Sequence, residues 1–336
     1  MTFSSAADKT MPRDFPLYVP LALERESRVV QSSLGRIQLR REVKIFSVGA
    51  VSVSIRVSFE AHGLGELIRY HSIRLEGGKT MDDAADDLCE EVLPSIEAAA
   101  VRMRPEKSDP EAYTVFCLVE DVPRREGNTA LQWLDEWRGE VAGLLTEEEA
   151  FDRLSDSEIQ ETTRYHYSYL VDDLVVIDWD SALIFDPGGK YEDLLYVLEI
   201  GNMQLTEFQV YDQTLERFLD QAYGHIESYS KARSLFRGPG PMLGRLKGVL
   251  MDLTKISEEI TNTTKFFGDW HQARVYMGCS ERFHLKEWER SLEGKLKSLE
   301  GLYKMLVEDV NNRRMLILES AIVILFIVDI LRLFVR

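Results

Sequence analysis

The sequence predicts an α+β protein, in which an N-terminal mixed α/β domain precedes long antiparallel helices that end in one transmembrane helix. Three observations support this fold class. Segments rich in β-branched residues alternate with short helical segments in the first half, leucines recur every seven residues in the second, and an apolar run closes the 336 residues. We therefore expect a flexible N-terminal segment, an α+β domain, a long-helix or coiled-coil stalk region and a C-terminal membrane anchor, at residues 1–35, 36–186, 187–312 and 313–336.

The first predicted elements are two strands in "RIQLRREVKIFSVGAVSVSIRVSFEA", joined near Gly49. A helix is predicted next in "TMDDAADDLCEEVLPSIEAAAVRM". Thr80 has the residue type of an N-cap, and acidic residues follow it in the first turn, where they complement the helix dipole. These features predict an early sheet followed by one helix.

The rest of the first half continues the alternation. "AYTVFCLVE" is a predicted strand and "TALQWLDEWRGEVAGLL" a predicted helix. Two capping boxes are predicted after it, one from Thr146 to Glu149 and one from Ser155 to Glu158. "YHYSYLVDDLVVIDWDSALIFD" predicts a strand pair that is broken near Asp172 and Asp173.

Long helices are predicted in the second half, over 191–231 and 242–267, around a turn at "RGPGPMLG". The following helix, 285–314, has a heptad pattern that predicts the seam of a coiled coil or a helical hairpin. One row of this seam is Leu285, Leu292, Leu299 and Leu306, and a second row is Leu296, Tyr303 and Val310. No Pro or Gly-rich break follows, so this helix is expected to continue into the terminal apolar run.

The terminal segment "MLILESAIVILFIVDILRLFVR" is long enough as a helix to span a hydrocarbon core of about 30 Å. Arg313 and Arg314 precede it, as expected of a cytoplasmic flank. Two carboxylates interrupt it, and Asp329 lies three residues before Arg332, at ion-pair spacing. Glu319 and Asp329 are either tolerated at the membrane interfaces or buried between associated copies of the helix. The alternative to a membrane span is a buried core helix.

Composition limits the partners and the compartment. The net charge of −17 disfavours nucleic-acid binding, which needs clustered basic residues. Three widely separated cysteines indicate a reducing compartment without a disulfide framework. The N-terminal residues lack the apolar core of a signal peptide. We therefore expect a single-pass membrane protein with most of the chain in the cytoplasm, a lipid bilayer and further copies of itself as partners, and one protein partner that the sequence does not identify.

Candidate catalytic residues are few. Asp178 and Asp180 in "VVIDWDSALIFD" share one face of a predicted strand and have the residue type of metal ligands. "IDWD" resembles the metal-binding strand of aminoglycoside-phosphotransferase-type kinases, but "RYHYSYLVDD" lacks the His-x-Asp catalytic loop of that family. The more economical interpretation is a strand with outward-facing aspartates. No glycine-rich phosphate loop or nucleophile elbow occurs, and we predict no enzyme activity, metal or cofactor.

The last third of the chain resembles the required-for-meiotic-nuclear-division (Rmd/Sif-type) family, a domain of unknown function. The resemblance rests on Leu318-Glu319, the run "AIVILFIV" and Asp329, in that order and spacing. "TKFFGDWHQARVY" and the helix from 285 are also similar to segments of that family. The resemblance covers about residues 170–335 and implies a membrane-associated, non-enzymatic protein that forms oligomers.

Taken together, the sequence predicts a C-terminally membrane-anchored oligomeric scaffold or tether without enzyme activity. One alternative is a channel- or transporter-like membrane assembly, because an α/β domain that feeds a long helix into a membrane also describes such proteins. The other alternative is a metal-dependent enzyme that uses Asp178 and Asp180.

Overall fold

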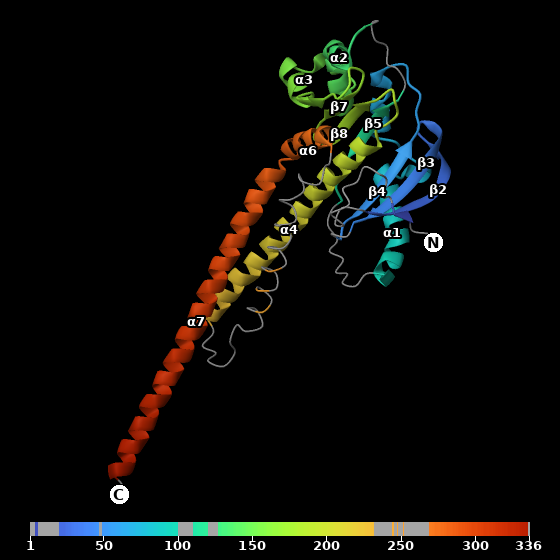
Figure 1. Ribbon diagram of the computed structural model, residues 1–336. Helices are drawn as coiled ribbons and strands as arrows, with labels where there is room; N and C mark the ends of the chain where they lie inside the picture. The colour runs from blue at the N-terminus through green and yellow to red at the C-terminus, as the bar shows by residue number, and fades with distance from the viewer. Residues whose placement is uncertain are drawn as a thin grey trace. The chain divides into compact units, whose positions relative to one another are not determined.

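The computed structural model describes residues 4–5, 20–46, 49–99, 110–119, 127–231, 244, 247, 251 and 269–334 (Figure 1). The chain divides into two compact units. The first comprises Met1–Glu207 and Asn262–Lys286, and the second comprises Phe208–Thr261 and Glu287–Arg336. Each of the two longest helices therefore begins in the first unit and ends in the second.

The first sheet is an antiparallel meander. Its strands are β1 (Ser4–Ser5), β2 (Leu21–Ser32), β3 (Gly35–Ile45) and β4 (Val51–Val57), paired in that order. The predicted turn between β3 and β4 is confirmed: Gly49 has a φ of 102°, a backbone conformation that favours glycine. β2 begins inside the segment that we expected to be flexible.

One helix and the last of three short 3-10 turns contact this meander, and the segment of the first two turns supplies Leu64, Leu67 and Ile68 to the core of the second sheet. The helix is α1 (Met81–Ala99), and the turns are η1 (Leu64–Glu66), η2 (Ile68–Tyr70) and η3 (Glu76–Gly78). Thr80 caps α1 as predicted, because its Oγ1 accepts a hydrogen bond from the Asp83 amide at 3.0 Å. Leu88 and Val92 of α1 pack against Val43, and Ile73 packs against Ile37 and Leu39 further along β3. Residues 37, 39 and 43 share one buried strand face. At one end of the meander the opposite face is covered as well, because Ala22 is buried and Lys44 contacts Glu199 of the helix that begins at Glu192.

The second sheet has the order β5-β8-β7-β6, with β5 parallel to β8 and the other pairs antiparallel. Its strands are β5 (Thr114–Leu118), β6 (Tyr165–Tyr167), β7 (Leu174–Ile177) and β8 (Ser181–Phe185). Every residue of β7 and β8 is buried. The predicted strand at 112–120 is confirmed. The predicted break near Asp172 and Asp173 separates β6 from β7, and a second turn at residues 178–180, which was not predicted, separates β7 from β8.

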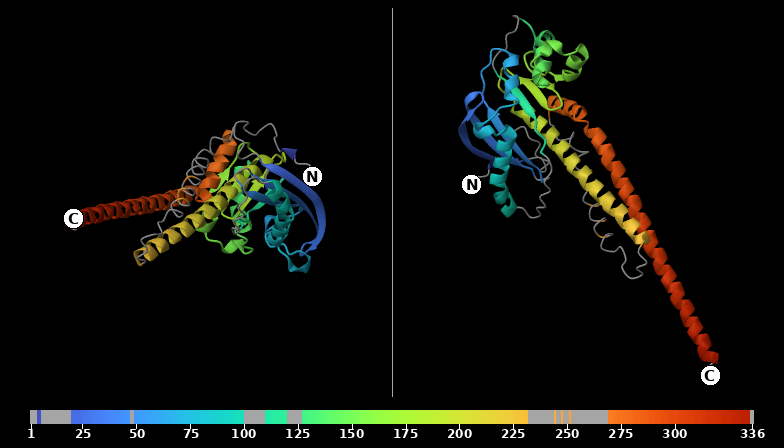
Figure 2. Two further views of the ribbon diagram at one scale, coloured as in Figure 1. Left: turned by 90° about the horizontal axis from the view of Figure 1, so that it is seen from below. Right: turned by 180° about the vertical axis from the view of Figure 1, so that it is seen from behind.

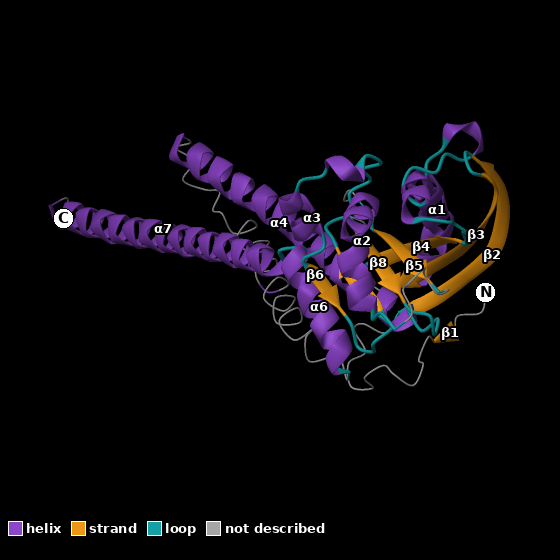
Figure 3. Cartoon of the chain, turned by 90° about the horizontal axis from the view of Figure 1, so that it is seen from above, coloured by secondary structure: helices purple, strands orange, loops and turns teal. Residues whose placement is uncertain are grey.

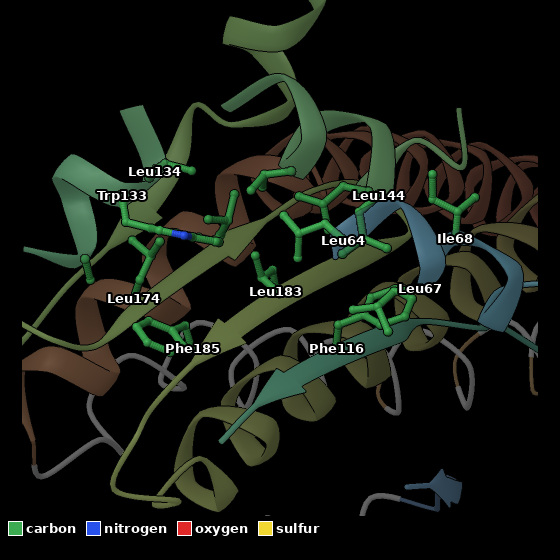
Figure 4. Packing of buried hydrophobic residues seen from close by; sticks show 14 residues of the cluster. Leu64, Leu67, Ile68, Phe116, Trp133, Leu134, Leu144, Leu174, Leu183 and Phe185 are labelled. Carbon is green, nitrogen blue, oxygen red and sulfur yellow. The ribbon is translucent and has the colours of Figure 1, made fainter. Parts of the chain in front are cut away.

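Helices lie on both faces of the second sheet (Figures 1 and 3). On one face lie α2 (Ala130–Leu145), the turn η4 (Phe151–Arg153) and α3 (Asp156–Thr162). Figure 4 shows the core between α2 and the sheet, in which Trp133, Leu134 and Leu144 pack with Leu183 and Phe185. Leu174, Val176, Leu183 and Phe185 supply the strand side of this core, and their neighbours in the strands point to the opposite face.

The capping predictions near α2 and α3 have different outcomes. Ser155 caps α3 as predicted, accepting a hydrogen bond from the Glu158 amide at 3.2 Å. The predicted N-cap at Thr146 is wrong, because Thr146 is the C-cap of α2 and its hydroxyl donates to the Ala142 carbonyl at 2.8 Å. A threonine hydroxyl can serve either end of a helix, and here the apolar run that precedes it forms the helix.

The remaining helices in the described part of the chain are α4 (Glu192–Lys231), α6 (Trp270–Arg282) and α7 (Leu285–Phe334), visible from several sides in Figures 1 and 2. The helices predicted from residues 191 and 285 are confirmed, and α7 continues without a break into the apolar run. The helix predicted at 242–267 lies almost entirely outside the described residues. Within the second unit, α4 and α7 lie side by side and run in the same direction (Figures 1 and 2), so the antiparallel arrangement predicted for the long helices is wrong.

The predicted transmembrane helix is also wrong. Within the described part of the chain, no helix combines the length and the apolarity needed to cross a membrane. Glu319, Asp329 and Arg332 interrupt the apolar run, and the nine residues Ser320–Val328 are its longest uncharged stretch. Nine helical residues extend only about 14 Å, less than half of a hydrocarbon core. This finding contradicts the predictions of a tail anchor and of a single-pass membrane location.

Close backbone packing between α4 and α6 makes Gly201 a sensitive position. A Cβ atom at residue 201 would lie 2.3 Å from Cys279 Sγ, and Cys279 is fully buried. Replacing Gly201 by Ala should therefore lower the free energy of unfolding by about 1–3 kcal/mol through overpacking.

Gly294 is the matched control, because it also lies within a helix but a Cβ atom there would meet nothing within 4 Å. Gly294→Ala should raise stability by up to about 1 kcal/mol. Denaturant unfolding of the two variants measures the difference. Equal effects of the two substitutions would contradict the proposed contact.

Candidate functional site

Asp178 and Asp180 lie in the turn between β7 and β8 and do not share a strand face. The Asp178 amide donates to the Ser181 carbonyl at 2.8 Å, which closes the turn. Asp178 is only 5% exposed, whereas Asp180 is exposed to solvent. The prediction of two outward-facing aspartates is therefore wrong for Asp178. The sequence pattern continued the strand through both residues, but the tight turn directs the two side chains differently.

A buried ion pair accounts for the position of Asp178. Its carboxylate accepts a hydrogen bond from Arg282 at the end of α6, and the same guanidinium donates to Glu161 Oε1 of α3 at 3.0 Å. The Arg282 side chain is 16% exposed and that of Asp178 is 7% exposed. One guanidinium thus links the β7–β8 turn, α3 and α6 within the first unit.

The electrostatic surroundings of the two aspartates differ. Burial raises the pKa of Asp178, and the charge and hydrogen bond of Arg282 oppose that rise. Burial also raises the pKa of Asp180, with further contributions from the negative charges of Glu111 and Glu147. The positive charge beside Asp178 is thus supplied by the Arg282 guanidinium of this protein. Among the described residues, no group of three or more His, Cys, Asp or Glu side chains is arranged to hold a metal ion.

His71 has contacts that fix its ring within the fold. Its Nε2 lies 2.8 Å from the Leu144 carbonyl, and its Nδ1 lies 3.2 Å from Glu147 Oε1. The ring also packs edge-on against Phe116. Because both ring nitrogens face acceptors at the end of α2, this histidine joins η2 to α2.

In the second unit, the predicted leucine rows of α7 contact α4. Leu292, Leu296, Leu299 and Tyr303 cluster with Tyr211, Leu215, Phe218 and Leu219. Beside this seam, Lys295 Nζ lies 2.6 Å from Asp212 and 2.7 Å from Glu216. Leu285 is buried within the first unit, and the side chain of Leu306 lies outside those described.

The apolar end of α7 is exposed around the helix. Thirteen large hydrophobic residues between Met315 and Leu331 are 45–66% exposed. The predicted site residues Arg314, Glu319, Asp329 and Arg332 are also exposed on this segment, and the side chain of Arg313 is outside the described set. A helix that is apolar on most of its surface requires cover on more than one side.

α4 covers only the first part of α7. Lys295 is level with Asp212 and Glu216 of the parallel helix, and α4 ends at Lys231. At 1.5 Å per residue in both helices, the end of α4 is level with about residue 312 of α7. Met315–Phe334 therefore extends beyond the described part of α4.

Sequence reasoning missed Arg282 and Glu161. Arg282 is separated from Asp178 by 104 positions and from Glu161 by 121, so no local pattern connects them. The one usable signal was the aspartate in an otherwise apolar strand sequence, because a buried carboxylate requires a cationic or hydrogen-bonding partner.

In its described part, the protein has an α+β fold with two four-stranded sheets and a long, partly apolar C-terminal helix. Residues 2–192 match the family described as "Uncharacterized protein MJ0711, N-terminal domain", and the chain belongs to this family. A similar protein is the uncharacterized protein MJ0711 of Methanocaldococcus jannaschii, with 20% identity over 230 residues. The alignment covers 66% of this chain and 65% of that relative, so the chain spans somewhat less than two thirds of the relative's length. No solved structure is significantly similar.

The resemblance to the Rmd/Sif-type family is therefore wrong. The family match covers residues 2–192, whereas the resemblance was drawn on about 170–335. Its strongest part was an apolar run with two acids, a composition that unrelated terminal helices share.

The Arg282 ion pair leads to a stability prediction. Arg282→Met leaves the Asp178 carboxylate buried without its cation, and should lower the free energy of unfolding by about 3–5 kcal/mol. Arg164→Met is the matched control, because Arg164 contacts the same Glu161 at 3.5 Å but is 61% exposed. The control should change stability by less than about 1 kcal/mol.

Thermal or denaturant unfolding of both variants measures the difference. If Arg282→Met were as mild as Arg164→Met, the pair with Asp178 would not organise the turn.

Proposed function

We propose that this protein is a non-enzymatic scaffold that associates with further copies of itself through the apolar end of α7. The observation that carries the proposal is the exposed apolar surface of Met315–Leu331. Contiguous apolar patches of more than a few hundred Å² are rare on monomeric proteins and mark interaction sites. Fully burying one such side chain contributes about 1.5–3 kcal/mol, so several of them suffice for stable association.

The non-enzymatic part of the proposal rests on the Asp178 turn. The alternative of a metal-dependent enzyme requires Asp178 and Asp180 to bind one cation. Asp178 instead contacts the Arg282 guanidinium, which would repel a metal ion at that carboxylate. The turn joins elements of the fold, and the charge of Asp178 is matched by that of Arg282 within the first unit.

Truncation after Asn312 tests the proposal. The shortened chain retains the α4–α7 seam but lacks the apolar end, so it should remain folded and become monomeric. The full chain should have a mass of at least two copies. Light scattering coupled to size-exclusion chromatography measures both masses, and circular dichroism checks that the truncated chain is folded.

A monomeric full-length chain would contradict self-association. Flotation with phosphatidylcholine vesicles tests whether the apolar end of α7 binds a lipid surface instead of further copies of the chain. A chain that remains monomeric and floats with the vesicles would assign the segment to a lipid surface and overturn the proposal.

A further inference from the structure

The heptad phase of α7 continues from the α4 seam into the exposed segment. Seven-residue steps from Leu296 and Tyr303 lead to Ile317, Ile324 and Leu331. The same steps from Leu299 lead to Leu306, Arg313, Ser320 and Ile327. With the first row at heptad position a, the second row is at d. The first row is therefore apolar beyond the end of α4, whereas the second row has Arg313 and Ser320 before Ile327.

The three charged residues of the segment lie away from these rows. In the same phase, Glu319 is at position c, Asp329 at f and Arg332 at b. Positions b, c and f are the outer positions of a coiled coil, which remain in water when a and d are buried. A bundle of helices packed through the a and d rows therefore leaves all three charges solvated, together with the apolar residues Leu318, Ile322, Leu325 and Phe326 at the same outer positions.

The flanking positions e and g distinguish a pair of helices from a larger bundle. In the contact between α4 and α7, Lys295 at position g forms ion pairs with Asp212 and Glu216, whereas Leu302 at the next g position is apolar and buried. Charged residues at e and g are typical of two-stranded coiled coils. In the distal segment all three g residues are apolar and exposed, namely Leu316, Val323 and Ile330. Three successive apolar g positions are all buried only when helices lie on more than one side.

The a and d residues indicate the same number of helices. Ile at both a and d favours three- or four-stranded parallel coiled coils over dimers. Ile317 and Ile324 are at a and Ile327 is at d, whereas Leu331 at a and Ser320 at d do not follow this pattern. The three isoleucines are about half exposed or more in the single chain.

We propose that Met315–Phe334 forms a parallel, in-register bundle of three or more copies of this chain, with the a, d and g residues inside and Glu319, Asp329 and Arg332 outside. This inference rests on the self-association proposed above and specifies its geometry. We infer the parallel direction from the contact between α4 and α7. These two helices run in the same direction, and α7 contacts α4 through its a and d rows, which continue into the exposed segment (Figure 1).

The number of copies is tested on the full chain by sedimentation equilibrium. The wild type should have at least three times the mass of one chain. Ile324→Lys at position a should reduce the mass to that of one chain. Val323→Lys with Ile330→Lys at position g should reduce it to two copies, because only the a and d rows remain apolar.

Phe326→Lys is the matched control, because Phe326 is 66% exposed and at the outer position c. It should leave the mass unchanged. A dimeric wild type would overturn the bundle but leave the proposed self-association intact, whereas a monomeric wild type would overturn both. Loss of assembly in Phe326→Lys together with retention in Ile324→Lys would overturn the assignment of faces.

The direction is tested with single cysteines at the two ends of the segment. Under mild oxidation, Ile317→Cys and Leu331→Cys should each form disulfide-linked pairs through their own position. In an antiparallel bundle these residues lie about 20 Å from their own copies and link only to one another. Wild-type chain is the background control, because Cys89 and Cys117 are partly exposed. Linkage only in a mixture of the two variants would overturn the parallel direction.

Discussion

Burial of both faces of the β7–β8 hairpin is the constraint on which the first unit depends. Every residue of the two strands is buried, so each face needs a layer of helices. α2 covers one face through Trp133, Leu134 and Leu144. α6 and the start of α4 cover the other, where their backbones approach closely at Gly201 and Cys279. α6 contacts β6 and β7 although it is far from them in the sequence, which explains why residues 262–286 belong to the same unit as the N-terminal half.

The charge on the hairpin turn follows from the same burial. A carboxylate brought into the protein interior loses hydration, and a nearby guanidinium compensates for part of that loss. Arg282 contacts both Asp178 and Glu161, so the turn is tied to helices of both layers. The residues that resembled a metal site in the sequence therefore contribute to the architecture of the fold.

In the second unit, the first part of α7 packs against α4, whereas its last part, from Met315, is exposed. In its first part, one apolar stripe contacts α4 and charged residues flank the stripe. Between Met315 and Leu331 the g positions are all apolar and exposed, while Glu319, Asp329 and Arg332 lie at outer positions. The same helix thus has a surface suited to one neighbour in its first part and to several neighbours at its end.

Local patterns in the sequence determined most of the elements. The two strands around Gly49, the cap at Thr80, the strand from Thr114 and the long helices from Glu192 and Leu285 all follow from alternation, capping chemistry or heptad spacing, which act over a few residues. The sequence also located the heptad rows and the apolar end of α7. Tertiary structure decided what lies far apart in the chain: the position of the turn at Asp178, its pairing with Arg282, and the parallel packing of α4 on α7. These features depend on which surfaces meet in three dimensions, and a contact across 104 residues leaves no periodicity in the chain. The membrane prediction was wrong because it gave weight to the apolar residues of the run, whereas three charged residues, Glu319, Asp329 and Arg332, interrupt that run.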